Sequence, residues 1–99
     1  MKRPIRHMVI FNLVCGKDSP DAEIFLKEGE NLLSSIPVVR NFEVLQQVSP
    51  KNDYDFGFSM TFDCDEDYQT YNEHPTHQGF VSERWNTEVS RFLEMDFIL

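Results

Sequence analysis

Residues 5–13 read IRHMVIFNL, a stretch in which apolar side chains occupy both faces of an extended chain. The odd-numbered positions from His7 to Leu13 fall on one face, and Met8 and Ile10 fall on the other. Alternation with a period of two predicts a β-strand. Because apolar residues line both faces, this strand is expected to lie in the centre of a sheet that is covered on both sides.

A helix is predicted to follow this strand after a short turn. In the segment DSPD, residues 18–21, Ser19 suits the N-cap and Pro20 suits the first helical position. Apolar or small residues then recur three or four positions apart on one stripe, at Ala22, Phe25, Gly29, Leu32, Leu33 and Ile36. Pro37 ends the helix, and the mid-helix Gly29 indicates a close approach of the helix to the sheet.

Three further segments predict strands, at residues 38–48, 56–62 and 92–99. The first is rich in β-branched and aromatic residues. The second alternates Phe or Met with small residues, which predicts one bulky face and one lean face. In the third, apolar residues alternate with Glu94 and Asp96.

Helices are predicted between the last two strands. Asp63 and Glu66 have the spacing of a capping box, so one helix is expected to begin there and to run through Tyr71. Pro75 interrupts it and is expected to open another helix that runs to about Val89. This order of elements predicts the α+β class and a ferredoxin-like βαββαβ sandwich, with a four-stranded antiparallel sheet and its helices on one face.

One face of such a sheet is left without helices. Met8 and Ile10 on the central strand would face water there unless something covers them. Contiguous exposed apolar surface on a sheet usually marks an interface. The simplest cover is a second copy of the chain, so we expect a homodimer formed through this face.

The composition fits one acidic domain spanning residues 1–99. Nine Lys and Arg residues against seventeen Asp and Glu residues give a formal net charge of -8. This charge repels phosphate, so neither a nucleic acid nor an anionic membrane surface is expected as a partner.

The N-terminus resembles a secretory leader only superficially. Its apolar run is short and is broken by Asn12, and Val14 stands before Cys15 where a cleavage site needs a small residue. Cys15 and Cys64 form no CxxC motif. We therefore expect no leader, a cytoplasmic location and two free thiols.

Four segments resemble those of one known family. They read RHMVIF at 6–11, IPVV at 36–39, YNEHPTHQGF at 71–80 and DF at 96–97, and the spacing Y-x-x-H-P-x-H-x-x-F is the most specific. Together they resemble the stress-responsive dimeric A/B barrel (Dabb) family over nearly the whole chain. The resemblance implies a homodimer in which two sheets pack face to face into a dimeric α+β barrel. It implies little about activity, because the family is largely uncharacterised.

The resemblance also suggests a site. The family includes a plant polyketide cyclase that closes a linear polyketide by aldol condensation, using a His and a Tyr between sheet and helices. The shared motif places these residues at His77 and Tyr71, the candidate catalytic pair. Aldol closure needs a base for the proton alpha to a carbonyl and a donor for the developing oxyanion, which imidazole and phenol supply. The candidate ligand-binding residues are His7, Val9, Phe11 and Phe80.

Structural roles stay open for the same residues. Tyr71 and His77 could be hydrogen-bonded to each other or to buried backbone. His74, before Pro75, is interpreted as a residue that caps backbone groups at a helix junction. The bulky face of residues 56–62 could fill the cavity entirely. Pro75 disturbs the facing of the two histidines and no third ligand is evident, so neither a metal nor a cofactor is expected.

Two functions therefore remain. The first is a homodimeric module without enzymatic activity that binds a small apolar ligand between sheet and helices. The second is a polyketide cyclase-like or lyase-like enzyme that uses His77 and Tyr71 for aldol-type acid and base chemistry. A cavity that reaches His77 would favour ligand chemistry, since small-molecule sites typically measure ~300 Å³ or more.

Overall fold

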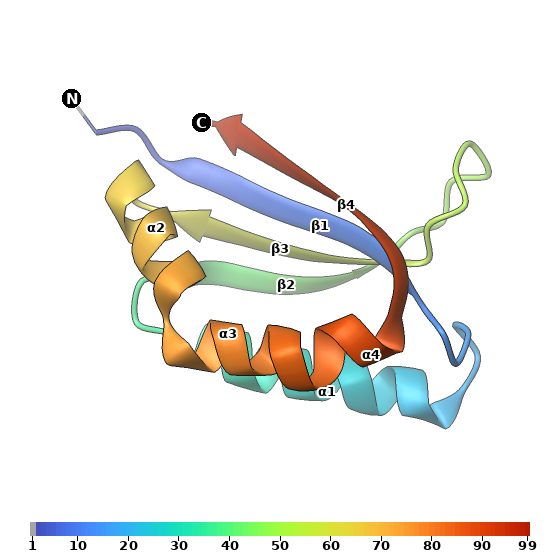
Figure 1. Cartoon of the computed structure of the whole chain (residues 1–99). Coiled ribbons are helices and arrows are strands. Elements are labelled where there is room, and N and C mark those ends of the chain that lie inside the picture. The colour runs from blue at the N-terminus through green and yellow to red at the C-terminus, as the bar shows by residue number, and fades with distance from the viewer. Residues whose placement is uncertain (1) are drawn as a thin grey trace.

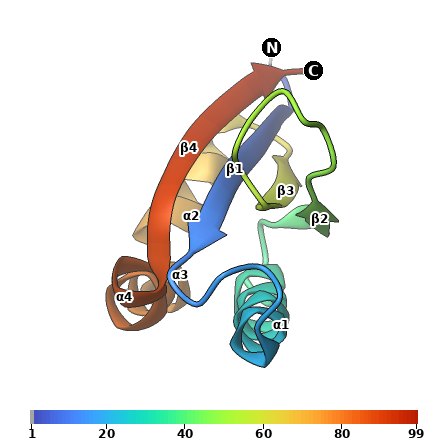
Figure 2. The same ribbon diagram turned by 90° about the vertical axis from the view of Figure 1, so that its right-hand side faces the viewer.

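A computed structural model describes residues 2–99 as a four-stranded antiparallel sheet with helices packed on one face (Figure 1). The strands are β1 (Ile5–Leu13), β2 (Arg40–Gln46), β3 (Phe56–Phe62) and β4 (Val89–Ile98), in the spatial order β2-β3-β1-β4. The helical elements are α1 (Pro20–Ser34), α2 (Asp65–Glu73), α3 (Pro75–Phe80), a π-helical turn η1 (Val81–Trp85) and α4 (Asn86–Glu88). Figure 2 shows α1 beside the helix formed by α3, η1 and α4, both under the same face of the sheet. The predicted ferredoxin-like fold is confirmed.

The first strand and the first helix form as their sequences predict. β1 lies between β3 and β4 and pairs with both in antiparallel fashion over the expected residues. Ser19 is the N-cap of α1, and its hydroxyl accepts a hydrogen bond from the backbone N–H of Asp21 at 3.2 Å. The local signals for strand period and helix capping are therefore sufficient for this half of the fold.

The start of α2 differs from the predicted capping box. Cys64 occupies the N-cap in an extended conformation and makes no side-chain cap. The two carboxylates instead pair with cations outside the helix, Asp63 with Arg40 at 3.7 Å and Glu66 with Lys2 at 3.1 Å. The N-cap lies one residue later than the predicted capping box requires, so Asp63 and Glu66 are out of register for the reciprocal capping bonds.

The other predicted bounds need smaller corrections. β2 is shorter than the segment 38–48, and β4 begins at Val89 instead of Phe92 because Val89 pairs with Leu13 beyond a bulge in β1. The helix that begins at Pro75 ends near the expected residue, at Glu88, but η1 interrupts its α-helical pattern.

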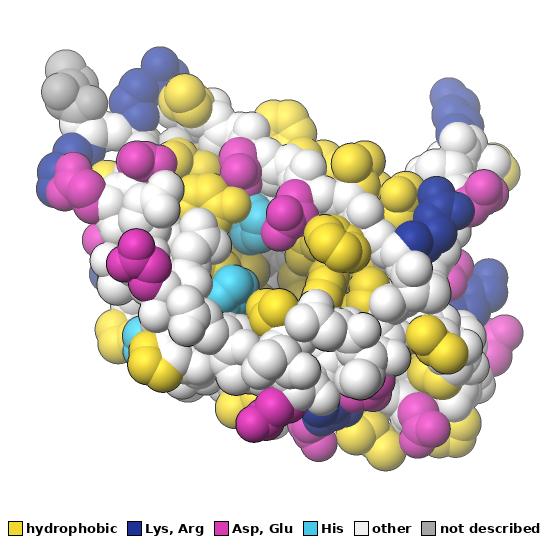
Figure 3. Space-filling model, viewed as in Figure 1, with side chains coloured by type: hydrophobic (Ala, Val, Ile, Leu, Met, Phe, Trp, Pro, Cys, Tyr) yellow, Lys and Arg dark blue, Asp and Glu magenta, His cyan; other side chains and the backbone are white. Residues whose placement is uncertain are grey.

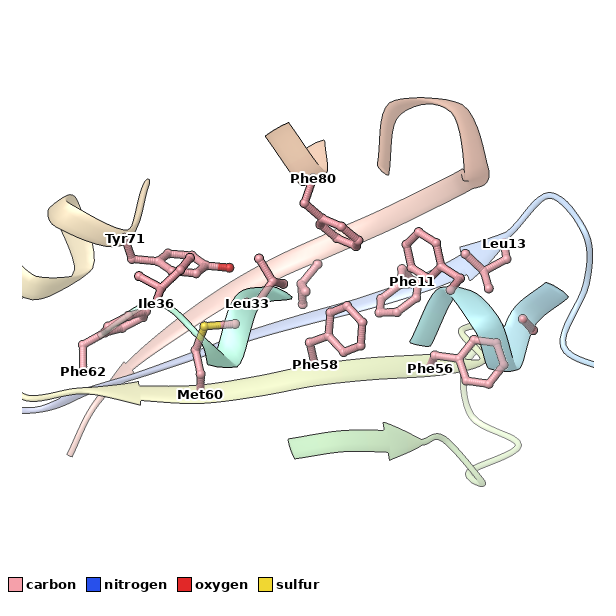
Figure 4. Close-up of a cluster of buried hydrophobic side chains, with 13 residues drawn as sticks. Phe11, Leu13, Leu33, Ile36, Phe56, Phe58, Met60, Phe62, Tyr71 and Phe80 are labelled. Atoms are coloured by element: carbon pink, nitrogen blue, oxygen red, sulfur yellow. The ribbon is translucent and has the colours of Figure 1, made fainter. Parts of the chain in front are cut away.

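The core is built from aromatic side chains between the sheet and the helices (Figure 4). The bulky face of β3 is buried against the helices, as predicted. The largest fully buried side chains are Phe11, Phe25, Phe58, Phe62, Ile36 and Met60. Gly29 lies where α1 comes closest to this layer, because a Cβ built on it would lie 2.7 Å from Cζ of Phe58.

We expect Gly29→Ala to destabilise the protein by about 1–3 kcal/mol, although alanine favours helices, because the new methyl group would overlap the Phe58 ring. Gly79→Ala is the matched control, since nothing lies within 4 Å of a Cβ built there. This second change should be neutral or stabilising by up to about 1 kcal/mol. Urea denaturation of the two variants tests the pair, and equal stabilities would contradict the close packing of α1.

The sheet face without helices carries a row of apolar side chains. Met8 pairs with Met95, and Ile10 pairs with Leu93, so all four side chains share this face. Leu93 is 51% exposed. The alternation in β4 therefore sends its apolar residues to the outer face of the sheet and its acidic residues to the helix side. We call Met8, Ile10, Leu93 and Met95 the outer apolar face.

Cys15 and Cys64 are both free, and they differ in accessibility. Cys15 is exposed after the end of β1, whereas Cys64 is only 5% exposed after the end of β3. A thiol reagent is therefore expected to modify one cysteine quickly in the native protein and the second only after unfolding. Mass spectrometry of the labelled protein checks the count, and a disulfide between the two would contradict the strand order.

Within residues 2–99, none of the helices has the length and apolar character needed to cross a membrane.

Candidate functional site

A pocket of about 230 Å³ lies between the sheet and the helix formed by α3, η1 and α4. Figure 3 shows the surface hollowed there, with histidine and acidic side chains beside hydrophobic ones. Its floor is apolar and includes Val9, Phe58 and Met60 from β1 and β3. The pocket thus has an apolar body with polar groups set into it.

The structure brings most of the sequence-predicted site residues to this pocket. His7, Val9, Tyr71, His77 and Phe80 all line it. The bulk of β3 covers the floor without closing the cavity.

Phe11 is the exception among the candidate ligand-binding residues. It is fully buried, and its ring centroid lies 4.9 Å from those of Phe58 and Trp85. It packs in the core and does not line the pocket. Phe11 lies on the expected face of β1, the one toward the helices, but Trp85 packs against its ring.

His7 is held by two neighbouring side chains. Its Nδ1 atom lies 2.6 Å from Oδ1 of Asp96 and 2.9 Å from the hydroxyl oxygen of Tyr68, which in turn donates to Oδ2 of Asp96 at 3.1 Å. A carboxylate can only accept, so Nδ1–H of His7 donates to Asp96. His7 is therefore held in a fixed orientation at the pocket wall.

Tyr71 and His77 come together across the bend between α2 and α3. Their ring centroids are 4.4 Å apart. His74 makes the bend as the N-cap of α3, and its Nδ1 atom accepts from the backbone N–H of Thr76 at 3.1 Å, which confirms its capping role. Nδ1–H of His77 donates to the carbonyl oxygen of Asn72 at 3.3 Å.

The Tyr71 side chain is 3% exposed, and its hydroxyl group makes no hydrogen bond among residues 2–99. Since no fully buried side-chain oxygen in this range lacks a partner, the hydroxyl oxygen is the accessible part of the residue. It points along the core toward Leu33 and Phe80, both of which line the pocket (Figure 4). An unpaired donor that faces a cavity is thus available to a ligand.

Burial determines the protonation states of Tyr71 and His77. It lowers the pKa of His77, and the nearby His7 and His74 lower it further, whereas the Asn72 carbonyl and Glu94 oppose the shift. Burial raises the pKa of Tyr71, to which the charge of Glu94 adds. At neutral pH the site therefore combines a neutral imidazole with a protonated phenol, the forms needed by a base and a hydrogen-bond donor.

We expect this shift to appear in the pH dependence of stability. Since the folded pKa of His77 lies below the ordinary 6.5, the unfolded chain binds more protons in this range, and stability falls as the pH drops below 6.5. His77→Gln should lose less stability than the wild type between pH 7 and pH 5. Thermal melts across this range check the difference, and parallel curves for both proteins would contradict it.

Sequence reasoning missed several polar residues of the site, namely Tyr68, Asn86, Glu94 and Asp96. Glu94 and Asn86 line the pocket, and Asp96 and Tyr68 hold His7. The alternation in residues 92–99 carried the signal, because Glu94 pairs with Val9 and Asp96 pairs with His7 across the two strands. Each must therefore share the helix side of the sheet with its partner.

Within residues 2–99, no three His, Cys, Asp or Glu side chains gather as a metal site.

Comparisons with known proteins agree on the fold. The sequence model of the Stress responsive A/B Barrel Domain family matches residues 5–99. A crystal structure of a Dabb family protein with a ferredoxin-like fold from Mesorhizobium loti is 45% identical, with a TM-score of 0.96, over 99% of this chain and 98% of that one. A dimeric ferredoxin-like protein of unknown function from Thermobifida fusca is 21% identical, with a TM-score of 0.78, over 100% and 93% of the two chains. The hydroxynitrile lyase of Passiflora edulis is 13% identical, with a TM-score of 0.85, over 100% and 95%, and therefore shares the fold alone.

Proposed function

The chain belongs to the stress responsive A/B barrel domain family, and from that membership we propose that it acts as a homodimer whose subunits each bind a small, largely apolar ligand. The observation that carries the proposal is the pocket, in which an apolar floor meets polar side chains that include His7, Tyr71 and His77. Small-molecule sites combine these two features.

The size of the cavity limits the ligand. A dry apolar cavity of about 150 Å³ is enough to hold benzene. The pocket measures about 230 Å³, which is below the ~300 Å³ typical of small-molecule sites, so it suits only a small molecule of one or two rings or a short folded chain. The Tyr71 hydroxyl can donate to the ligand and the imidazole of His7 can form a hydrogen bond with it, so a carbonyl or hydroxyl group would be held at the polar end.

The proposed homodimer forms through the outer apolar face. The helices pack on the opposite side of the sheet and cannot cover Met8 or Ile10. Related structures described as dimeric and ferredoxin-like support self-association. Two free cysteines fit a reducing compartment, so the cytoplasm is the proposed location.

Binding of 2-acetylnaphthalene, a two-ring methyl ketone, tests the proposed pocket. In an NMR titration of the ¹⁵N-labelled protein, the amide signals of pocket residues should shift. Val81 lines the pocket, so Val81→Phe should fill it and abolish these shifts. Val48 is 89% exposed in a loop away from the pocket, so Val48→Phe is the matched control and should bind as the wild type does. Shifts that persist in Val81→Phe would place the ligand elsewhere.

A second candidate function is acid and base chemistry on a bound carbonyl compound. The unpaired Tyr71 hydroxyl beside the neutral His77 favours it. Nε2 of His77 would take a proton alpha to the carbonyl, and the electron pair of the C–H bond would move to the carbonyl oxygen. Tyr71 would donate a hydrogen bond to the enolate oxygen that forms. This step is shared by aldol closure and its reverse, as a cyclase-like or lyase-like enzyme would need.

A further inference from the structure

The wall of the pocket formed by β4 is acidic. Glu94 lines the pocket directly, and Asp96 stands two residues further along the same face, bound to His7 and Tyr68. In an antiparallel pair these side chains lie directly beside Val9 and His7 of β1. A ligand that reaches His7 therefore comes close to two carboxylates.

No lysine or arginine lines the pocket within residues 2–99. Arg84 lies on η1, close to this region, but Glu28 and Glu88 both bind its guanidinium group. Its charge is already neutralised, and its side chain does not line the cavity. Apart from the imidazole of His7, which is bound to Asp96, no side chain that lines the pocket within residues 2–99 could offset the charge of an anion against Glu94.

We propose that the pocket selects uncharged ligands with a carbonyl or hydroxyl group over carboxylates of the same shape, and that Glu94 sets this selectivity. This inference rests on the proposed ligand-binding function and adds the chemical class of the ligand. Glu94 is exposed where it lines the pocket, so its repulsion of a bound carboxylate is partly screened by water and is strongest at low salt. The Tyr71 hydroxyl, by contrast, can donate equally well to a neutral carbonyl oxygen.

The influence of Glu94 reaches the polar end of the pocket. Its charge adds to the rise in the pKa of Tyr68 and of Tyr71, and it favours the protonated form of His77. Three side chains around the cavity are thus exposed to the same negative field. A bound carboxylate beside these residues would be exposed to it as well.

The test compares 2-acetylnaphthalene with 2-naphthoate, in which a negatively charged oxygen replaces the methyl group. Isothermal titration calorimetry at pH 7.5 and low salt should show that the wild type binds the ketone at least about tenfold more tightly. In Glu94→Gln, 2-naphthoate should bind about three- to tenfold more tightly than in the wild type, and the ketone should change less than twofold. Glu83→Gln removes one negative charge from η1 at an exposed position outside the pocket, so it should keep the wild-type preference.

The other outcomes of this titration would contradict either the selectivity or the ligand site itself. Equal affinity of the wild type for the two compounds would overturn the inference and leave the ligand pocket intact. A preference that is unchanged in Glu94→Gln, or reduced equally in Glu83→Gln, would also overturn it, because Glu94 would then not be its source. If neither compound binds the wild type, the proposed ligand-binding function itself fails.

Discussion

Replacing Leu93 by glutamate is expected to convert the proposed homodimer into a monomer of 11.7 kDa. Leu93 lies opposite Ile10 on the outer apolar face and is 51% exposed in the single subunit, so the change should leave the fold of the subunit intact. In the dimer the same change would bury two unpaired carboxylates, one from each copy. Such burial costs about 3–5 kcal/mol per charge, so the dissociation constant should rise at least about a thousandfold.

Light scattering with circular dichroism checks this expectation, since it reports mass and fold together. Ile24→Glu is the matched control, because Ile24 is also 51% exposed but lies on α1. This control should stay dimeric. A wild-type protein with a mass of 11.7 kDa would rule out the homodimer, and a dimeric Leu93→Glu protein would show that the interface lies on another surface.

The second large effect concerns the chemistry of the pocket. With 2-acetylnaphthalene in D₂O, the wild type should accelerate exchange of the methyl protons, because this exchange requires only the base and the oxyanion donor. Tyr71→Phe should slow the catalysed exchange by about 10²–10³-fold, as is typical when one oxyanion donor is removed. His77→Ala should slow it by about 10²–10⁴-fold, the range for a general base. NMR integration of the methyl signal over time measures both rates.

Stability separates a catalytic role of Tyr71 from a structural one. Its hydroxyl has no partner within residues 2–99, so Tyr71→Phe should leave the melting temperature almost unchanged. Tyr68→Phe provides the contrast, because it removes the hydroxyl group that donates to Asp96, at a cost of about 1–3 kcal/mol. If the wild type exchanges the methyl protons no faster than buffer does, or if Tyr71→Phe matches the wild type, the enzymatic alternative is wrong and ligand binding remains.

Local patterns in the sequence were sufficient to predict those features of the fold that depend on a single strand, helix or bend. The limits of β1 followed from period-two alternation, and the start of α1 followed from Ser19 and Pro20. The bend at Pro75 brought Tyr71 and His77 together, as the spacing of the motif suggested. In each case the deciding interactions lie within a few residues of one another in the chain.

The rest required knowledge of partners far apart in the sequence. Glu94 and Asp96 look like residues on the outer face of an amphipathic strand, yet Glu94 lines the pocket and Asp96 binds His7, because the apolar residues of β4 lie on the outer face. Asp63 looks like a helix cap until Arg40 is placed beside it. Phe11 shares a face with His7, but whether it lines a cavity depends on where Trp85 packs. In all three cases the position of the residue depends on contacts with residues far away in the sequence.

The π-helical turn η1 makes the shape of the pocket depend on chain length. The backbone N–H of Asn86 donates to the carbonyl of Val81, five residues earlier, and both residues line the cavity. In an uninterrupted α-helix, five residues span about 500°, so two such side chains would point well apart. The wider turn therefore brings Asn86 to the cavity wall. An insertion or deletion at this turn would change which side chains line the cavity while the sheet stays the same.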